Sequence, residues 1–260
     1  METQFTKYLQ FIEMKFKILF FFSIFPVILK GGGRIAYPAK GNICIEEGTI
    51  EMWIKTGFEP EQKSDEYKLI LPLLQFYEPE IKFNISISYI CVQGGKAQWS
   101  AGIDFQGEKL FRLTAIPIGW KKDEWHHIAL SWKYNKAIFY LDGKAVCEVK
   151  SNKPVVGEIK NGLIYIGDRW TNEKIKTEVV IDDLRISCIE RKAEEIGFNF
   201  SERLKPDPFT LLLENFEEIS ENKNKETKPV IISGLSGEKG GEIIGGKLVN
   251  GRFGKGLSLF

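Results

Sequence analysis

Apolar and polar residues alternate along a series of short segments that are separated by glycine-bearing turns. In residues 125–132, every second residue from Ile128 onward is apolar, which is the period-two pattern of a strand with one buried face. A second apolar and aromatic run covers residues 137–141, and Asp142 and Gly143 follow it. Glycine tolerates positive φ and aspartate hydrogen-bonds its own backbone, so these two residues suit a turn. The pattern predicts two adjacent strands with a turn at each end.

The same alternation predicts roughly a dozen strands and almost no helix, apart from one or two helical turns at residues 190–196. Pro72 interrupts one of the strands and therefore indicates an edge strand or a bulge. Many short strands with regularly spaced turns are typical of an all-β protein, an antiparallel two-sheet sandwich or jelly roll. The expected strands cover residues 34–39, 42–46, 49–55, 69–76, 83–89, 97–105, 110–116, 128–132, 137–141, 145–149, 163–168 and 179–187.

Residues 1–30 differ from the rest and are predicted to be a leader or signal-like apolar segment. The basic stretch Met14–Lys17 precedes a twelve-residue apolar run, Ile18–Leu29, as in the n- and h-regions of a secretory signal. The run is short for a bilayer span. Thirteen residues precede Met14 and no small-x-small cleavage site follows, so a buried strand or helix of the fold is the alternative. We expect a secreted or cell-surface protein.

Composition narrows the function classes. The 260 residues carry 36 basic and 35 acidic side chains, a net charge of +1, which gives no electrostatic reason to expect nucleic acid or an anionic surface as partner. The four cysteines are far apart and form no C-x-x-C pair, which argues against a zinc site. We expect buried free thiols, while the even count leaves one or two disulfides open outside the cytosol. The cysteines are Cys44, Cys91, Cys147 and Cys188.

Several of these segments together resemble a known family. Residues 48–55, 124–132, 139–144, 164–167 and 181–187 occur in the order and at the spacing of the laminin G-like branch of the concanavalin A-like lectin/glucanase superfamily. The resemblance covers about residues 31–197. It implies a concanavalin A-like jelly roll of two curved sheets, often extracellular, often repeated, and often binding glycans or proteins.

The order of the remaining motifs departs from the family. Members open with segments similar to residues 211–216 and 251–260, which here come last. The chain therefore resembles one repeat cut out of phase from a tandem array, or a permuted domain. An unpaired edge is costly and a tail of this size hardly builds its own core, so we expect residues 206–260 to close the first domain as a permuted edge. A truncated second unit is the alternative.

No catalytic residue is predicted. His126 and His127 are adjacent on a strand, so they point to opposite faces and cannot share one site. Glycoside hydrolases need two carboxylates about 5 to 9.5 Å apart across a cleft. The strand signature Glu-x-Asp-x-x-Glu is absent, and Glu51 has no acidic partner two residues away.

Calcium is the metal that the resemblance leaves open. Asp168, at the end of a strand, and Asp182 are the candidate ligands by analogy with the family. Calcium needs several converging oxygens, and no neighbouring sequence forms a calcium loop. The competing interpretation is that these carboxylates bond turns or pair with Arg169 and Arg185.

Aromatic side chains with polar neighbours are the usual platforms for sugars. Trp53 shares a strand face with a glutamate and a lysine, and Trp170 lies in a polar loop beside Arg169. We expect these two tryptophans to be exposed and, with Arg169, to bind ligand. Trp125 and Trp132 are expected in the core.

The sequence thus favours a non-catalytic recognition module of an exported repeat protein, binding a glycan or an extracellular protein at its loops or concave sheet. A structural spacer of a surface array is the alternative, and a glycoside hydrolase-like enzyme comes third. No nucleic acid partner and no stable membrane span are expected.

Overall fold

A computed structural model gives the fold. The chain divides into two units, Met1–Lys30 and Gly31–Phe260. The structure describes residues 34–61, 69–91, 95–167, 179–196, 199, 201–217, 219–220, 230–231, 242–244 and 247–258, all within the second unit. The predicted leader therefore lies outside the described residues.

The described part of the chain consists of β-strands joined by turns and loops. The strands are β1 (Arg34–Pro38), β2 (Glu47–Thr56), β3 (Leu69–Glu78), β4 (Phe83–Cys91), β5 (Gln98–Phe105), β6 (Glu108–Ala115), β7 (Trp125–Lys133), β8 (Lys136–Leu141), β9 (Lys144–Lys150), β10 (Leu163–Gly167), β11 (Val179–Ser187), β12 (Thr210–Glu214), β13 (Ile219–Ser220), β14 (Val230–Ile231), β15 (Glu242–Ile244), β16 (Lys247–Asn250) and β17 (Lys255–Ser258).

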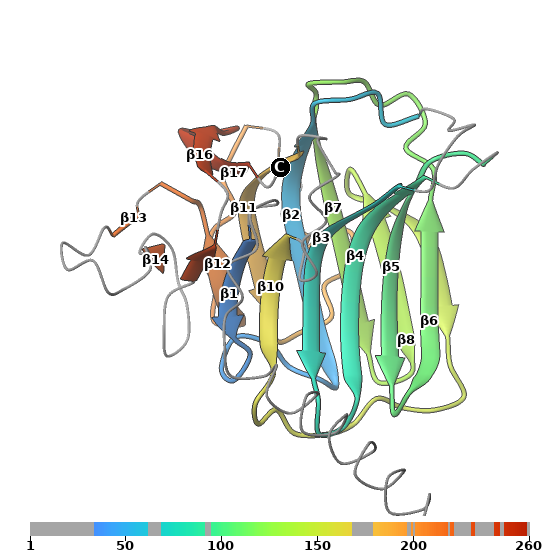
Figure 1. The fold of residues 1–260 in the computed structure, drawn as a ribbon. Helices are drawn as coiled ribbons and strands as arrows, with labels where there is room; N and C mark the ends of the chain where they lie inside the picture. The colour runs from blue at the N-terminus through green and yellow to red at the C-terminus, as the bar shows by residue number, and fades with distance from the viewer. Residues whose placement is uncertain are drawn as a thin grey trace, which may run out of the picture. The chain divides into compact units, whose positions relative to one another are not determined.

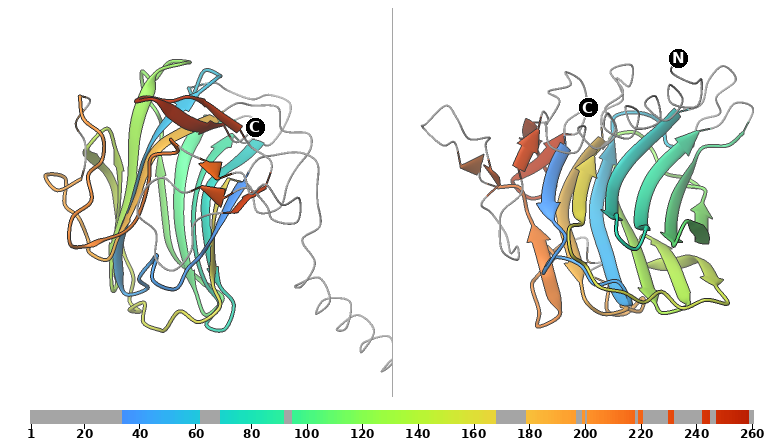
Figure 2. Two further views of the ribbon diagram at one scale, coloured as in Figure 1. Left: turned by 90° about the vertical axis from the view of Figure 1, so that its left-hand side faces the viewer. Right: turned by 60° about the horizontal axis from the view of Figure 1, so that its bottom comes forward.

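These strands form two antiparallel sheets packed face to face (Figures 1 and 2). One sheet has the order β13-β14-β15-β1-β10-β3-β4-β5-β6. The other has the order β16-β17-β11-β2-β7-β8-β9, with β12 also paired to β11. The predicted all-β, two-sheet antiparallel sandwich is confirmed.

The core between the sheets follows from the alternation along each strand. On β4, Phe83, Ile85, Ile87 and Tyr89 are fully buried, whereas the residues between them are more exposed at one end of the strand. On β2, Ile50, Met52 and Ile54 belong to the same core. Trp132 of β7 lies there too, and its indole N–H donates to the carbonyl of Ile45 at 2.8 Å. One continuous apolar layer therefore holds the two sheets together.

Three local expectations are resolved. Residues 42–46 form no strand, because the Asn42 side chain donates to the carbonyl of Pro38 and the chain turns there. Pro72 lies at a bulge: the register between β3 and β4 shifts between Pro72 and Leu74, and β3 is an interior strand. Residues 190–196 form a single turn, closed by the bond from the Ile196 N–H to the carbonyl of Lys192.

Strands from the last fifth of the chain pair with both sheets. β12 and β17 pair with β11, and β15 pairs with β1. Whether residues 206–260 close this domain as a permuted edge or begin a second unit stays a prediction. The pairings favour closure, because they cover strand edges that the rest of the chain leaves open.

Candidate functional site

The outer face of the eight-stranded sheet, turned away from the core, carries the polar side chains of β2, β7 and β11. Thr49, Glu51 and Trp53 point to this face, since they alternate with the core residues of β2. All three are fully buried. A covering segment, residues 188–196 and 201–209, lies over this face (Figure 2).

A hydrogen-bonded layer joins the covering segment to the sheet. The Thr49 hydroxyl donates to the carbonyl of Ile189 at 2.7 Å and accepts from the N–H of Arg191 at 2.9 Å. The Ser131 hydroxyl donates to the carbonyl of Arg191 at 2.9 Å. Ile196 packs on Ala129 beside them. These contacts close the outer face to solvent around Thr49, Ser131 and Ala129.

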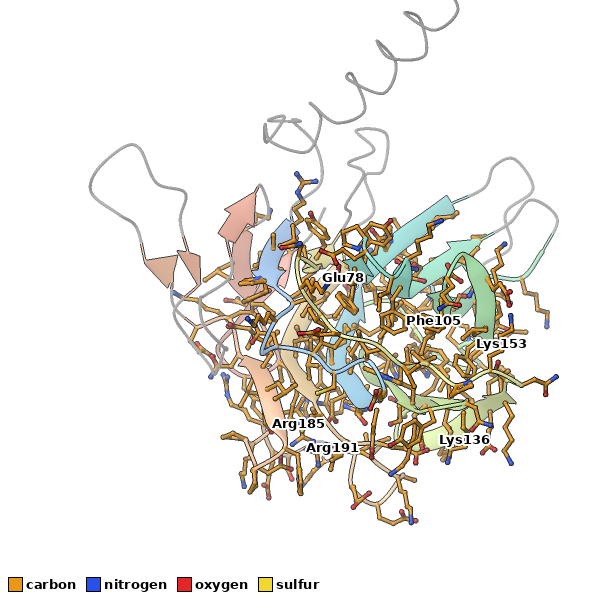
Figure 3. All side chains as sticks on the ribbon, turned by 90° about the horizontal axis from the view of Figure 1, so that it is seen from below. Glu78, Phe105, Lys136, Lys153, Arg185 and Arg191 are labelled. Atoms are coloured by element: carbon orange, nitrogen blue, oxygen red, sulfur yellow. The ribbon has the colours of Figure 1, made fainter. Side chains whose placement is uncertain are left out.

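A buried ionic cluster lies under the same segment. The Glu51 carboxylate accepts from Arg185 at 2.7 Å (Nε) and 2.5 Å (Nη2), and its other oxygen is 3.2 Å from His127 Nε2. Burial raises the pKa of Glu51, but the bonds to His127 and Arg185 outweigh it and hold the pKa below its usual value. Arg191, labelled beside Arg185 in Figure 3, pairs with Asp207 at 2.6 Å. The cluster is closed and internally compensated, so it offers no carboxylate to a substrate.

Next to this cluster, two aspartates at a bulge in β11, Asp182 and Asp183, bind the backbone of segments that cover the outer face. Asp182 Oδ2 accepts the N–H groups of Arg252 at 2.7 Å and Phe253 at 3.1 Å, in the turn between β16 and β17. Asp183, with φ of 46°, accepts the N–H of Leu204 at 3.1 Å. Burial raises the pKa of Asp182 to about 6, against the effect of its backbone hydrogen bonds.

The predicted exposure of Trp53 is wrong. The Trp53 side chain is 0% exposed, because the Arg252 guanidinium stacks on its ring at 3.7 Å and His127 packs edge-on at 5.2 Å. Arg252 is itself fixed by the carbonyls of Asn199 and Glu202, each at 3.1 Å. Trp53 therefore packs against the turn of the β16–β17 hairpin instead of facing solvent.

A pocket of about 270 Å³ opens where β2 ends. Two of its lining residues, Lys55 and Val180, are Cα partners on β2 and β11. The hairpin β16–β17 supplies one wall of the pocket, and the loop before β7 supplies the other. Both lie at the end of the sheet where β2 ends and β11 begins, near the labels β16 and β17 in Figure 1. The lining residues are Lys55, Gly57, Asp123, Val180, Val249 and Asn250.

The pocket combines polar groups of different kinds with the apolar side chains of Val180 and Val249. Lys55 donates hydrogen bonds, Asp123 accepts them, and the amide of Asn250 does both. Asp123 has φ of 64°, and its N–H donates to the carbonyl of Thr56 at 2.8 Å, which fixes this wall. Trp125 borders the site, with the Lys55 ammonium 5.2 Å from its ring centre. Such a pocket suits a small, hydroxyl-rich ligand.

The structure describes only some of the residues predicted to bind a ligand or a metal. Arg169, Trp170 and Asp168 lie outside the described residues, so their roles stay predictions. Asp182 is fully buried and bonded to backbone N–H groups. In the described part of the chain, no three His, Cys, Asp or Glu side chains gather in a way that could hold a metal ion. Trp125, expected in the core, is half-buried.

Sequence reasoning missed Lys55, Asp123 and Asn250 as one site. The alternation along residues 49–55 puts Lys55 on the same strand face as Trp53, and this is a usable signal. Asn250 comes from the predicted closing segment, about 195 residues further along the chain, and no local pattern brings it to β2. Within the described residues, no helix has the length and apolar character needed to cross a membrane.

Comparisons with known proteins agree with this architecture. A model of the family described as the concanavalin A-like lectin/glucanases superfamily, Laminin_G_3, matches residues 29–197. No curated protein matches the sequence significantly.

Solved structures resemble the chain distantly. A putative carbohydrate binding protein from Bacteroides ovatus is 13% identical over 85% of this chain and 59% of its own, with a TM-score of 0.48. A heptameric SAP-like pentraxin from Limulus polyphemus is 11% identical over 84% of this chain and 92% of its own, with a TM-score of 0.47. The botulinum neurotoxin serotype G binding domain is 16% identical over 58% of this chain, with a TM-score of 0.41; the match spans about a third, 35%, of that chain.

The family match extends over more than half of the 260 residues and coincides with strands β1 to β11. This chain belongs to the concanavalin A-like lectin/glucanase superfamily, and residues 29–197 are its laminin G-like, lectin-type domain.

Proposed function

We propose that this protein is a non-catalytic recognition module that binds a glycan in the pocket between β2, β11 and the β16–β17 hairpin. The observation that carries the proposal is the lining of this pocket, which combines Lys55, Asp123 and Asn250 with the apolar side chains of Val180 and Val249. The proposal also includes export from the cell and a role for calcium, and these two points rest on the sequence alone.

The chemistry of the lining supports a sugar as ligand. Each sugar hydroxyl both donates and accepts, so it pairs with an ammonium, a carboxylate and an amide together. The apolar faces of Val180 and Val249 suit the C–H groups of a pyranose ring, and the half-buried Trp125 offers an aromatic surface at the rim. The volume of about 270 Å³ is just below that of pockets for drug-sized ligands, roughly 300 to 1,000 Å³. One or two sugar rings are therefore the expected size.

The burial of Glu51 supports a non-catalytic role. This carboxylate lies under the covering segment and is compensated by Arg185 and His127. A glycoside hydrolase needs two accessible carboxylates on either side of a bond. The Asp123 carboxylate in the pocket shares its lining with a lysine and an asparagine, and among the described residues of that lining it is the single acidic one.

A glycan array with the full chain, followed by calorimetry of the best ligand, tests the proposal. Asp123→Asn keeps the left-handed backbone, which asparagine tolerates, and Lys55→Met keeps the length of the side chain. Each removes a hydrogen bond to a charged group, so each should weaken binding by about tenfold or more. Lys133→Met is the matched control, because Lys133 lies at the opposite end of the β2–β7 pair and should bind as the wild type does.

Three results would contradict the proposal. No binding on a wide array, with or without calcium, would favour a structural spacer. Binding that survives both pocket substitutions would move the site elsewhere, to a protein partner surface or to the loop with Arg169 and Trp170. Release of reducing sugar from a polysaccharide would favour an enzyme.

A further inference from the structure

Two of the four cysteines lie at the same end of the eight-stranded sheet, opposite the pocket. Cys44 precedes β2 by three residues, and Cys188 follows β11 directly. Since β2 and β11 are antiparallel neighbours with Thr49 opposite Ser187, the start of one and the end of the other lie side by side. Both cysteines are free thiols and partly exposed. Cys188 lies close enough to Cys44 to help raise the pKa of its thiol.

Several bonds hold the backbone on both sides of this pair. The Glu47 carboxylate accepts the N–H of Glu190 at 3.0 Å, and the N–H of Cys188 donates to the carbonyl of Phe209 at 2.9 Å. On the other side, the carbonyl of Ile45 accepts the Trp132 indole N–H at 2.8 Å. The two cysteines are therefore neighbours because their flanking residues are fixed, not because of a chance contact between loose loops.

We propose that Cys44 and Cys188 form a disulfide bond in an oxidising environment, and that this bond locks the start of β2 to the end of β11. The remaining two cysteines offer no comparable arrangement. Cys91 is buried at the end of β4 in the other sheet, and Cys147 lies on β9, at the edge of the eight-stranded sheet.

The reaction is a thiol–disulfide exchange with a small-molecule disulfide as oxidant. One cysteine thiolate attacks a sulfur of the oxidant, forms a mixed disulfide and releases one small thiol. The second cysteine attacks the protein sulfur of the mixed disulfide and releases the other small thiol. Two protein thiols are oxidised to one S–S bond, one small disulfide is reduced to two thiols, and their two protons come from the cysteines.

The surroundings of the pair set the rate of this exchange. Burial raises the pKa of the Cys44 thiol to about 11, and Cys188, Glu46 and Glu47 act in the same direction. Since the thiolate is the attacking species, bond formation should be slow at neutral pH and accelerate as the pH rises. The same two carboxylates repel incoming thiolates, which protects the bond once it has formed.

The bond should stabilise the fold measurably. It closes a loop of more than 140 residues, from Cys44 to Cys188, and the stabilisation from a cross-link grows with loop length. For a domain of this size, the expected rise in Tm is roughly 10 °C.

The experiment uses the full chain incubated with oxidised glutathione, followed by alkylation of free thiols, peptide mass mapping and thermal unfolding. We expect one linked peptide pair, containing Cys44 and Cys188, and a lower Tm after reduction. Cys44→Ser and Cys188→Ser should each show the Tm of the reduced wild type and should not respond to reductant. Cys147→Ser, the matched control, should keep both the linkage and the difference in Tm.

Alkylation of Cys44 and Cys188 after oxidation, or a linked peptide that contains Cys91 or Cys147, would overturn the proposal. So would an oxidised wild type whose Tm equals that of Cys44→Ser. Glycan binding gives a separate readout, because the pair lies at the opposite end of the β2–β11 ladder from Lys55 and Val180.

Discussion

The replacement Glu51→Gln tests the buried ionic cluster on the outer face. It preserves the shape of the side chain but removes the negative charge that faces Arg185 at 2.5 Å and His127 at 3.2 Å. Arg185 is 5% exposed, so its charge stays buried without its counter-charge. Removing one partner of such a pair costs about 3–5 kcal/mol of the free energy of unfolding. For a domain of this size, the Tm should fall by roughly 10 °C.

Urea unfolding followed by tryptophan fluorescence measures this loss. The matched control is Glu108→Gln, because Glu108 pairs with Lys153 (labelled in Figure 3) at 2.6 Å, yet both side chains are 58% exposed. An exposed pair contributes less than about 1 kcal/mol. The two substitutions are chemically identical, so the difference between them isolates the effect of burial.

The pH dependence of the same variant gives a second check. The folded pKa of Glu51 lies below the 4.5 of the free side chain. Its stabilisation is therefore fully present above pH 4.5 and is lost as the pH falls through the folded pKa. The gap between wild type and Glu51→Gln should narrow at acid pH. A loss below about 1 kcal/mol at neutral pH, or a gap that stays constant into acid, would refute the account of this cluster.

Three further predictions concern the tail and the packing of the sheets. Burial raises the pKa of Asp182 to about 6 from 3.8, so its ionisation opposes folding and the free energy of unfolding should fall as the pH rises between these values. In urea unfolding at several pH values, Asp182→Asn should lose this decrease, and a variant with the same pH dependence as the wild type would contradict the prediction. Burial raises the pKa of Glu214 to about 8 from 4.5, so the wild type should lose stability relative to Glu214→Met as the pH rises through that range. A difference in Tm between the two proteins that does not change with pH would contradict this prediction. An added Cβ at Gly48 would overlap the Trp132 ring, so Gly48→Ala should cost roughly 2 kcal/mol or more by overpacking. A wild-type Tm in thermal unfolding would contradict this prediction.

Local alternation was sufficient to predict most of the fold. The expected strand at residues 49–55 lies within β2, and residues 179–187 match β11. Period-two patterns are read correctly because one face of each strand packs into the core between the sheets. The strand predicted at residues 42–46 is wrong because alternation reports burial and not backbone conformation. Ile43 and Ile45 are buried as in a strand, but the backbone turns at Asn42.

The outer face could not be predicted, because its covers come from distant parts of the chain. Alternation placed Trp53 correctly on the second face of β2, but it does not say that Arg252 stacks on that ring. The pocket has the same origin, since Lys55, Asp123 and Asn250 come from three separate segments. The pairing of β17 with β11, together with that of β16 with β17, brings Asn250 to Lys55.

The most direct test of the proposed binding site is an NMR titration that follows the indole N–H signals of the tryptophans as the array-selected glycan is added. Trp125 borders the pocket, whereas Trp132 donates its indole N–H to Ile45 at the opposite end of the sheet. We predict that the Trp125 signal shifts with the glycan concentration, that the Trp132 signal stays in place, and that Asp123→Asn reduces the shift. A titration that moves Trp132 while Trp125 remains unchanged would contradict the account.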